Sequence, residues 1–101
     1  MRYELNSTQV FDEWLMKLDG SLKRRLANRL LQVENGNLGD YKTVSQNLFE
    51  LRCFFGGGLR LYCTIHKDRV FLLLVGGNKS SQEKDVAKAK AMLIELGVRD
   101  D

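Results

Sequence analysis

The chain has 101 residues, of which 44% are hydrophobic and 29% charged, with a net charge of +3. This length supports a single domain, residues 1–101, with one core, and no apolar run approaches the ~20 residues of a membrane span. The N-terminal segment Met1–Leu5 does not read as a signal peptide, so we expect a cytoplasmic protein.

The first half of the chain predicts a short strand followed by two helices. Arg2–Leu5 alternates polar and apolar residues, as a strand does. Apolar residues then recur at helical spacing from about Thr8 to Leu18 and again from about Leu22 to Asn35. Because the turn at Gly20 is short, we expect an antiparallel helical hairpin whose apolar face needs a sheet to cover.

The second helix also carries a basic cluster, which consists of Lys23, Arg24, Arg25 and Arg29. Such a cluster could bind nucleic acid. The favoured interpretation is a solvated helix face on which arginine stems cover apolar surface.

The second half predicts a meander of three antiparallel strands. The runs of strand length are Asn47–Phe55, Leu59–His66 and Arg69–Gly77. Tight turns at Gly56–Gly58 and at Lys67-Asp68 separate them, which is typical of two hairpins. The preceding segment, Tyr41–Gln46, is interpreted as a polar connector.

Alternation along the first two strands divides the sheet into two faces. One face is wholly apolar, and its residues are Phe49, Leu51, Cys53, Leu59, Leu61, Cys63 and Ile65. The opposite face bears Arg52, Arg60 and Tyr62, with Glu50 beside them. We expect the apolar face to form the core, with both cysteines buried and reduced. Two cysteines without a histidine cluster make no zinc site.

The last strand and the C-terminus complete the predicted fold. Val70–Val75 is apolar on both faces, so it is expected to be central or covered on its second side. Ser80 and Glu83 fit a capping box that opens a final helix ending at Gly97. The fold class is α+β: a small antiparallel sheet with a helical hairpin on one face and a C-terminal helix, in the order β-α-α-β-β-β-α.

Basic residues exceed acidic ones between Leu38 and Ser81, on the predicted sheet and its loops. This excess is expected of a surface that meets an anion, although an ordinary solvated face remains the alternative. Lys79 precedes a helix N-terminus and could complete a phosphate-sized cluster with Arg52 and Arg60, or be a simple loop lysine. Cationic groups of this kind suit phosphodiester cleavage, because they stabilise charge on the phosphate.

Five segments resemble the RelE/ParE superfamily of type II toxins, in particular the short addiction-module killer proteins grouped with HigB-like toxins. They are Phe11–Leu15, Asn37–Lys42, Leu48–Arg52, Gly58–Tyr62 and Leu72–Gln82. The resemblance covers nearly the whole chain and implies a RelE-like fold. Many members cut messenger RNA in the ribosomal decoding site, whereas the ParE branch poisons DNA gyrase.

The resemblance also implies roles for individual residues. Arg52 and Arg60 would stabilise the scissile phosphate, and Lys79 would add charge or donate a proton. Lys42 is a looser match to the basic residues that relatives carry near the second strand. Beyond the resemblance, we expect Tyr62 to position the substrate, and Ser80 and Gln82, like Lys42, to contact it. No metal or other cofactor is implied. The final helix has neither the tyrosine nor the histidine that some RNA-cutting relatives place there, so the acid and base are not assigned.

We therefore expect a toxin that acts as a ribosome-dependent mRNA endoribonuclease and inhibits translation. The alternatives are a gyrase-directed toxin of the same fold and a non-catalytic partner of a DNA-binding antitoxin. Expected partners are a cognate helix-turn-helix antitoxin, the ribosome and mRNA. Contact with DNA would occur only through the antitoxin, and no contact with membranes is expected.

Overall fold

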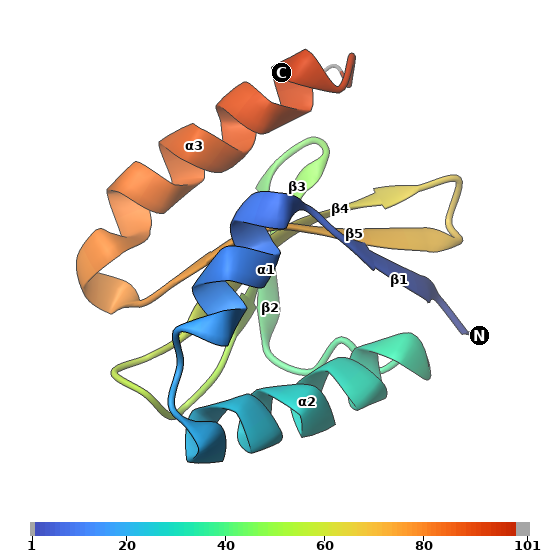
Figure 1. Ribbon diagram of the computed structural model, residues 1–101. Coiled ribbons are helices and arrows are strands. Elements are labelled where there is room, and N and C mark those ends of the chain that lie inside the picture. Colours follow the sequence, from blue (N-terminus) through green and yellow to red (C-terminus); the bar gives the residue numbers. More distant parts are fainter. Residues whose placement is uncertain (1, 99–101) are drawn as a thin grey trace.

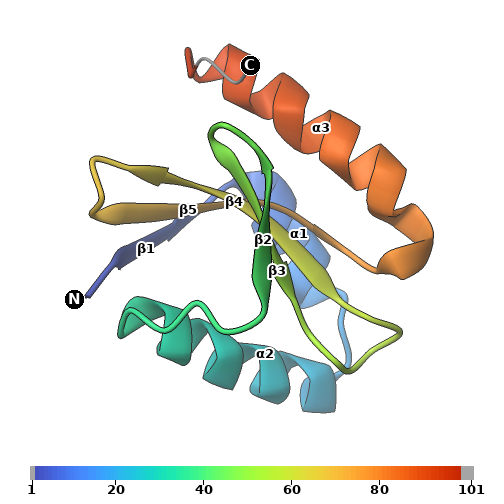
Figure 2. The same ribbon diagram turned by 180° about the vertical axis from the view of Figure 1, so that it is seen from behind.

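The computed structural model describes residues 2–98 as a five-stranded sheet with helices on both faces (Figures 1 and 2). The elements are β1 (Glu4–Ser7), α1 (Gln9–Met16), α2 (Gly20–Glu34), β2 (Tyr41–Ser45), β3 (Leu48–Arg52), β4 (Arg60–His66), β5 (Val70–Gly77), a 3₁₀ turn (Lys79–Ser81) and α3 (Gln82–Glu95). The predicted α+β class is confirmed. Across these residues, every helix is too short or too polar to cross a membrane.

The sheet has the strand order β1-β5-β4-β3-β2. Strand β1 pairs in parallel with β5, and the other neighbours are antiparallel. The prediction of a purely antiparallel sheet is therefore wrong at this one edge. The reason is that β1 leads into two helices and not into a tight turn, so no hairpin imposes an antiparallel partner.

Strand β2 occupies the segment that the sequence suggested was a connector. It pairs with β3, with Tyr41 opposite Leu51 and Lys42 opposite Glu50. The strand lies at the sheet edge, is largely exposed, and has an irregular register between Thr43 and Ser45. An exposed, irregular edge strand carries little apolar alternation, which explains why the pattern missed it.

The first core lies between the sheet and the helices α1 and α2. Leu51, Cys53, Leu61 and Cys63 from the predicted apolar face pack there against residues such as Phe11. The two helices share this face as predicted, although they cross and do not run antiparallel (Figure 1). Both cysteines are free and buried, which confirms the prediction, and burial raises the pKa of each thiol.

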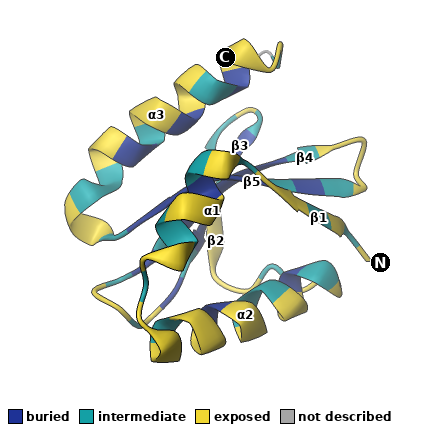
Figure 3. Ribbon diagram, viewed as in Figure 1, coloured by how far each residue is buried: buried dark blue, intermediate teal, exposed yellow. Residues whose placement is uncertain are grey.

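A second core lies on the opposite face, where α3 packs across the sheet (Figure 3). Leu48, Tyr62 and Leu74 meet Ala89 and Leu93 there. The arginine-bearing face is therefore not an open surface, as its polar residues suggested, but is covered along much of its length. Strand β5 is covered on both sides, which confirms the expectation drawn from its two apolar faces.

The start of α3 is fixed by a cap other than the predicted pair Ser80 and Glu83. Asn78 Oδ1 accepts hydrogen bonds from the backbone N–H groups of Ser80 and Ser81, at 2.9 and 3.3 Å. In return, Ser81 Oγ accepts one from the Asn78 N–H at 3.2 Å. This reciprocal cap opens the 3₁₀ turn that carries Lys79, so it sets where that lysine stands.

Two consecutive glycines at the end of β5 allow neighbouring elements to approach its backbone. A Cβ atom at Gly76 would overlap the ring of Trp14 in α1. A Cβ atom at Gly77 would overlap the carboxylate of Asp85 in α3. Asp85 is itself held by a hydrogen bond from Ser81 Oγ at 2.5 Å, so α3 docks closely against the sheet at this point.

We predict that Gly77→Ala lowers the free energy of unfolding by about 2 kcal/mol, because Asp85 must leave its hydrogen bond to make room. Gly20→Ala is the matched control. Its added Cβ meets nothing nearer than Arg24 Nη1 at 3.6 Å, so stability should hold or rise slightly. Urea unfolding measures both variants, and equal midpoints would contradict the close docking of α3.

Candidate functional site

The three predicted catalytic residues come together at one end of the sheet. Arg52 ends β3 and Arg60 begins β4, and the two are direct cross-strand partners. Lys79 follows β5, whose terminal Gly77 pairs with Arg60. All three line a shallow pocket of about 280 Å³, whose full lining is Asp40, Arg52, Cys53, Phe54, Gly58, Arg60 and Lys79.

The glycine loop between β3 and β4 brings Arg60 and Lys79 together. Gly56, Gly57 and Gly58 all have positive φ, at 61°, 73° and 78°, which glycine adopts without strain. Arg60 Nη1 donates a hydrogen bond to the carbonyl oxygen of Gly58 at 2.9 Å. A Cβ atom at Gly58 would lie only 3.6 Å from Lys79 Cβ, so the loop backbone bridges the two cations.

Glu50 is the buried counter-charge of the site, with a side chain only 1% exposed. Its Oε1 lies 3.6 Å from Arg52 Nε and 3.7 Å from Arg60 Nε, distances of ion pairs and not of hydrogen bonds. Its Oε2 accepts a hydrogen bond from Gln82 Nε2 at 2.9 Å. Two arginines that face each other across strands repel, and Glu50 offsets this repulsion.

The two arginines lead from this buried carboxylate to the surface. The side chain of Arg60 is 14% exposed and that of Arg52 is 39% exposed. Glu50 lies near Nε of each side chain, and Arg60 Nη1 also donates to the Gly58 carbonyl oxygen, so these contacts hold both guanidinium groups at the pocket that the two residues line. A planar guanidinium presents paired N–H donors that match phosphate oxygens. The geometry therefore suits an anion held between the two side chains.

Two predicted substrate-binding residues lie at the start of α3 and have partners within the protein. Gln82 donates its hydrogen bond to Glu50, as described above. Ser80 Oγ donates to Asn78 Oδ1 at 2.6 Å. Both residues, with Lys79, also line an adjoining hollow formed by residues 79–84. A contact of either residue with substrate stays a prediction.

The structure separates Tyr62 and Lys42 from the pocket. Tyr62 is fully buried under α3, so the predicted direct contact with a substrate is unavailable. Burial, and then the nearby Glu50 carboxylate, raise the pKa of Tyr62, so the phenol stays protonated at neutral pH. Lys42 is exposed on β2, opposite Glu50, and shares the face of the arginines without lining their pocket.

Two residues of the pocket were given no role by the sequence. Phe54 is 87% exposed, the highest value among the exposed large apolar residues of the described chain. Asp40 is held by its backbone, since its carbonyl oxygen accepts hydrogen bonds from Arg52 N–H at 2.9 Å and Arg29 Nη2 at 3.1 Å. The alternation of Glu50, Arg52 and Phe54 was the signal for Phe54, whereas the sequence marks Asp40 only as a loop residue.

Two arginines of the basic cluster on α2 make structural contacts. Arg29 Nη2 donates to the Leu38 carbonyl oxygen at 2.6 Å, as well as to that of Asp40. The guanidinium of Arg25 lies over the ring of Phe55, 4.4 Å from its centroid. These contacts agree with arginines that cover neighbouring groups, and they hold the loops beside the pocket.

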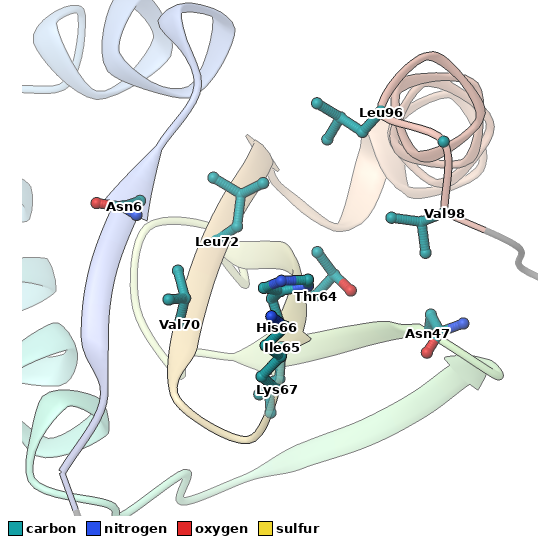
Figure 4. Close-up of a pocket in the computed structure, with 11 residues that line it drawn as sticks. Asn6, Asn47, Thr64, Ile65, His66, Lys67, Val70, Leu72, Leu96 and Val98 are labelled. Carbon is teal, nitrogen blue, oxygen red and sulfur yellow. The ribbon is translucent and has the colours of Figure 1, made fainter.

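A larger hollow of about 580 Å³ lies at the far end of the β4–β5 hairpin, beneath the C-terminal end of α3 (Figure 4). Its walls include His66, Lys67, Leu72, Leu96 and Val98 and are mainly apolar. It contains none of the predicted site residues, and it has no pair of arginines to bind a phosphate. The smaller, cationic pocket is therefore the candidate site.

Comparison with known sequences places the chain among its relatives. A family model described as phage-derived protein Gp49-like matches residues 13–96. An uncharacterized protein of Haemophilus influenzae is 38% identical over 99 residues, which cover 97% of this chain and 100% of the relative.

Three solved structures with a similar fold are a toxin and two toxin–antitoxin complexes. A mutant of the Escherichia coli toxin RelE in the free state matches with a TM-score of 0.75 and 14% identity, over 92% of this chain and 99% of that one. The RelBE2 toxin–antitoxin complex of Mycobacterium tuberculosis gives 0.64 and 17%, over 78% and 100%. The intact Escherichia coli RelBE complex gives 0.59 and 17%, over 75% and 95%. The predicted RelE-like fold is confirmed.

We predict that Glu50→Gln lowers the free energy of unfolding by about 2–4 kcal/mol, because it leaves Arg52 and Arg60 opposed without a counter-charge. Glu34→Gln is the matched control, since Glu34 pairs with Arg2 at 3.9 Å on the surface. Its loss should cost less than about 1 kcal/mol. Chemical unfolding compares the two, and equal losses would show that Glu50 does not hold the arginines.

Proposed function

This chain belongs to the Gp49-like family and has the fold of the RelE toxins, and we propose that it is the toxin of a type II toxin–antitoxin system. We further propose that it is a metal-independent endoribonuclease that cleaves mRNA on the ribosome. The observation that carries the proposal is the pocket at which Arg52, Arg60 and Lys79 meet.

The proposed reaction is attack of a ribose 2′-oxygen on the adjacent phosphorus. The bond from phosphorus to the 5′-oxygen of the next nucleotide breaks, leaving a 2′,3′-cyclic phosphate and a 5′-hydroxyl. Negative charge gathers on the non-bridging oxygens as the new bond forms. Arg52 and Arg60 supply fixed N–H donors to those oxygens, and this stabilises the transition state without a metal.

The reaction also moves two protons, and the pocket offers two groups for them. The 2′-hydroxyl loses its proton, for which the Asp40 carboxylate is the candidate acceptor. The 5′-oxygen gains a proton as it leaves, and Lys79 is the candidate donor. Tyr62 is too deeply buried for either role, so its part is to support Glu50 and the arginines from below.

The proposed partner in the cell is a small antitoxin with its own helix-turn-helix domain. Two of the similar solved structures are toxin–antitoxin complexes, which supports a partner of this kind. A cationic pocket is complementary to acidic side chains, so the antitoxin would present such residues to Arg52, Arg60 and Lys79, or bind elsewhere and prevent entry into the ribosome. Both proteins would act in the bacterial cytoplasm, with DNA bound only by the antitoxin.

We predict that Arg52→Ala and Arg60→Ala each reduce mRNA cleavage about 10²–10³-fold and relieve growth arrest. Arg24→Ala on the outer face of α2 is the control and should remain toxic. Primer extension on cellular mRNA after induction measures cleavage. Folded arginine variants with full activity would refute the assignment, and growth arrest with intact mRNA but inhibited gyrase would favour the ParE-like alternative.

Co-expression with the adjacent gene tests the partner. We expect a small DNA-binding protein to co-purify through a tag on this chain and to restore growth. If no small protein co-purifies and growth is not restored, the chain is not half of a toxin–antitoxin pair.

A further inference from the structure

Phe54 projects into solvent at the rim of the candidate site. Its exposed fraction of 87% exceeds those of Met16 and Ile94, both 74%. Single exposed apolar residues are common on protein surfaces and need no explanation by themselves. What distinguishes Phe54 is its surroundings, because Arg52, Arg60 and Lys79 line the same pocket.

Phe54 also lines a second hollow, which shares Asp40, Arg52, Cys53 and Phe54 with that pocket. The second hollow, of about 360 Å³, is also lined by Arg25 and Arg29. Basic residues therefore line both of the hollows that Phe54 borders. Neither Met16 nor Ile94 lines either hollow.

The residues on either side of Phe54 are anchored. Cys53 is buried, and its N–H donates to the Leu59 carbonyl oxygen at 2.9 Å. Phe55 lies under the Arg25 guanidinium, and its carbonyl oxygen accepts a hydrogen bond from the Leu59 N–H at 3.1 Å. The chain thus turns one phenylalanine inward and presents the other, Phe54, from a fixed position.

We propose that Phe54 is a base-stacking residue that selects single-stranded RNA at this site. An RNA phosphate would lie between Arg52 and Arg60, and the base of a nucleotide flanking that phosphate would stack on the Phe54 ring. Every base has a π-face, so an aromatic ring among phosphate-binding cations recognises unpaired nucleotides with little sequence preference. This inference rests on the proposed endoribonuclease function and adds a substrate contact to it.

Single-turnover cleavage on mRNA-programmed ribosomes tests the contact, with a natural or an abasic nucleotide on each side of the scissile phosphate. In the wild-type protein, removing the stacked base should slow cleavage about 10-fold or more. Phe54→Ala should slow cleavage of the natural mRNA by a similar factor, and the abasic substitution should then cause no further loss. Phe54→Tyr should restore the rate, and Met16→Ala should match the wild type.

The outcomes separate this inference from the proposed function. If Arg60→Ala abolishes cleavage but Phe54→Ala does not slow it, the function stands and the stacking contact is refuted. If Phe54→Ala and the abasic substitution each slow cleavage and their factors multiply when combined, the ring and the base act independently. That result also refutes the stacking contact. If Phe54→Ala leaves cleavage intact but weakens binding of the co-expressed antitoxin, Phe54 is a protein contact instead. A wild-type protein that cleaves no mRNA on ribosomes overturns both.

Discussion

The site depends on one buried carboxylate placed between two arginines. Register pairs Arg52 directly with Arg60 across β3 and β4, and two like charges at such a position would push the strands apart. Glu50 lies beneath them, near Nε of both, and is tied to α3 by Gln82. A single acidic side chain therefore makes a dense patch of positive charge compatible with a folded sheet. Both arginines still line the surface pocket, where the side chain of Arg52 is the more exposed of the two.

The placement of α3 determines how much of this face remains open. Gly77 allows Asp85 to approach the end of β5, and the Asn78 cap begins the helix at that point. From there α3 covers the middle of the sheet and buries Tyr62 in a second core. One end of this face, which carries Arg52 and Arg60, stays accessible, and the turn at Lys79 supplies the third cation there. The packing that stabilises the helix thus also confines the candidate site.

Much of this arrangement could be predicted from alternation along two strands. Period-two spacing distinguished the core face from the face that carries Glu50, Arg52 and Arg60. This inference holds because a shift of one residue in strand register would move the apolar side chains of the core face into solvent. The same spacing could not reveal that α3 covers Tyr62, because a tyrosine side chain, with its apolar ring and its hydroxyl group, is found both on surfaces and in cores. Strand β2 escaped notice because an exposed, irregular edge needs no apolar alternation. Asp40 is held beside the pocket by hydrogen bonds to its backbone carbonyl oxygen, and such bonds cannot be predicted from the type of side chain.

An anion site of this kind requires Arg52 and Arg60 to be held in place before any substrate binds. Nitrogen relaxation NMR at arginine Nε tests this directly in the free protein, with the exposed Arg24 of α2 as the internal reference. We expect the Nε–H groups of Arg52 and Arg60 to be ordered on the picosecond-to-nanosecond timescale, and that of Arg24 to be mobile. Equal mobility at all three positions would contradict a preformed anion site and leave Glu50 without the role assigned to it.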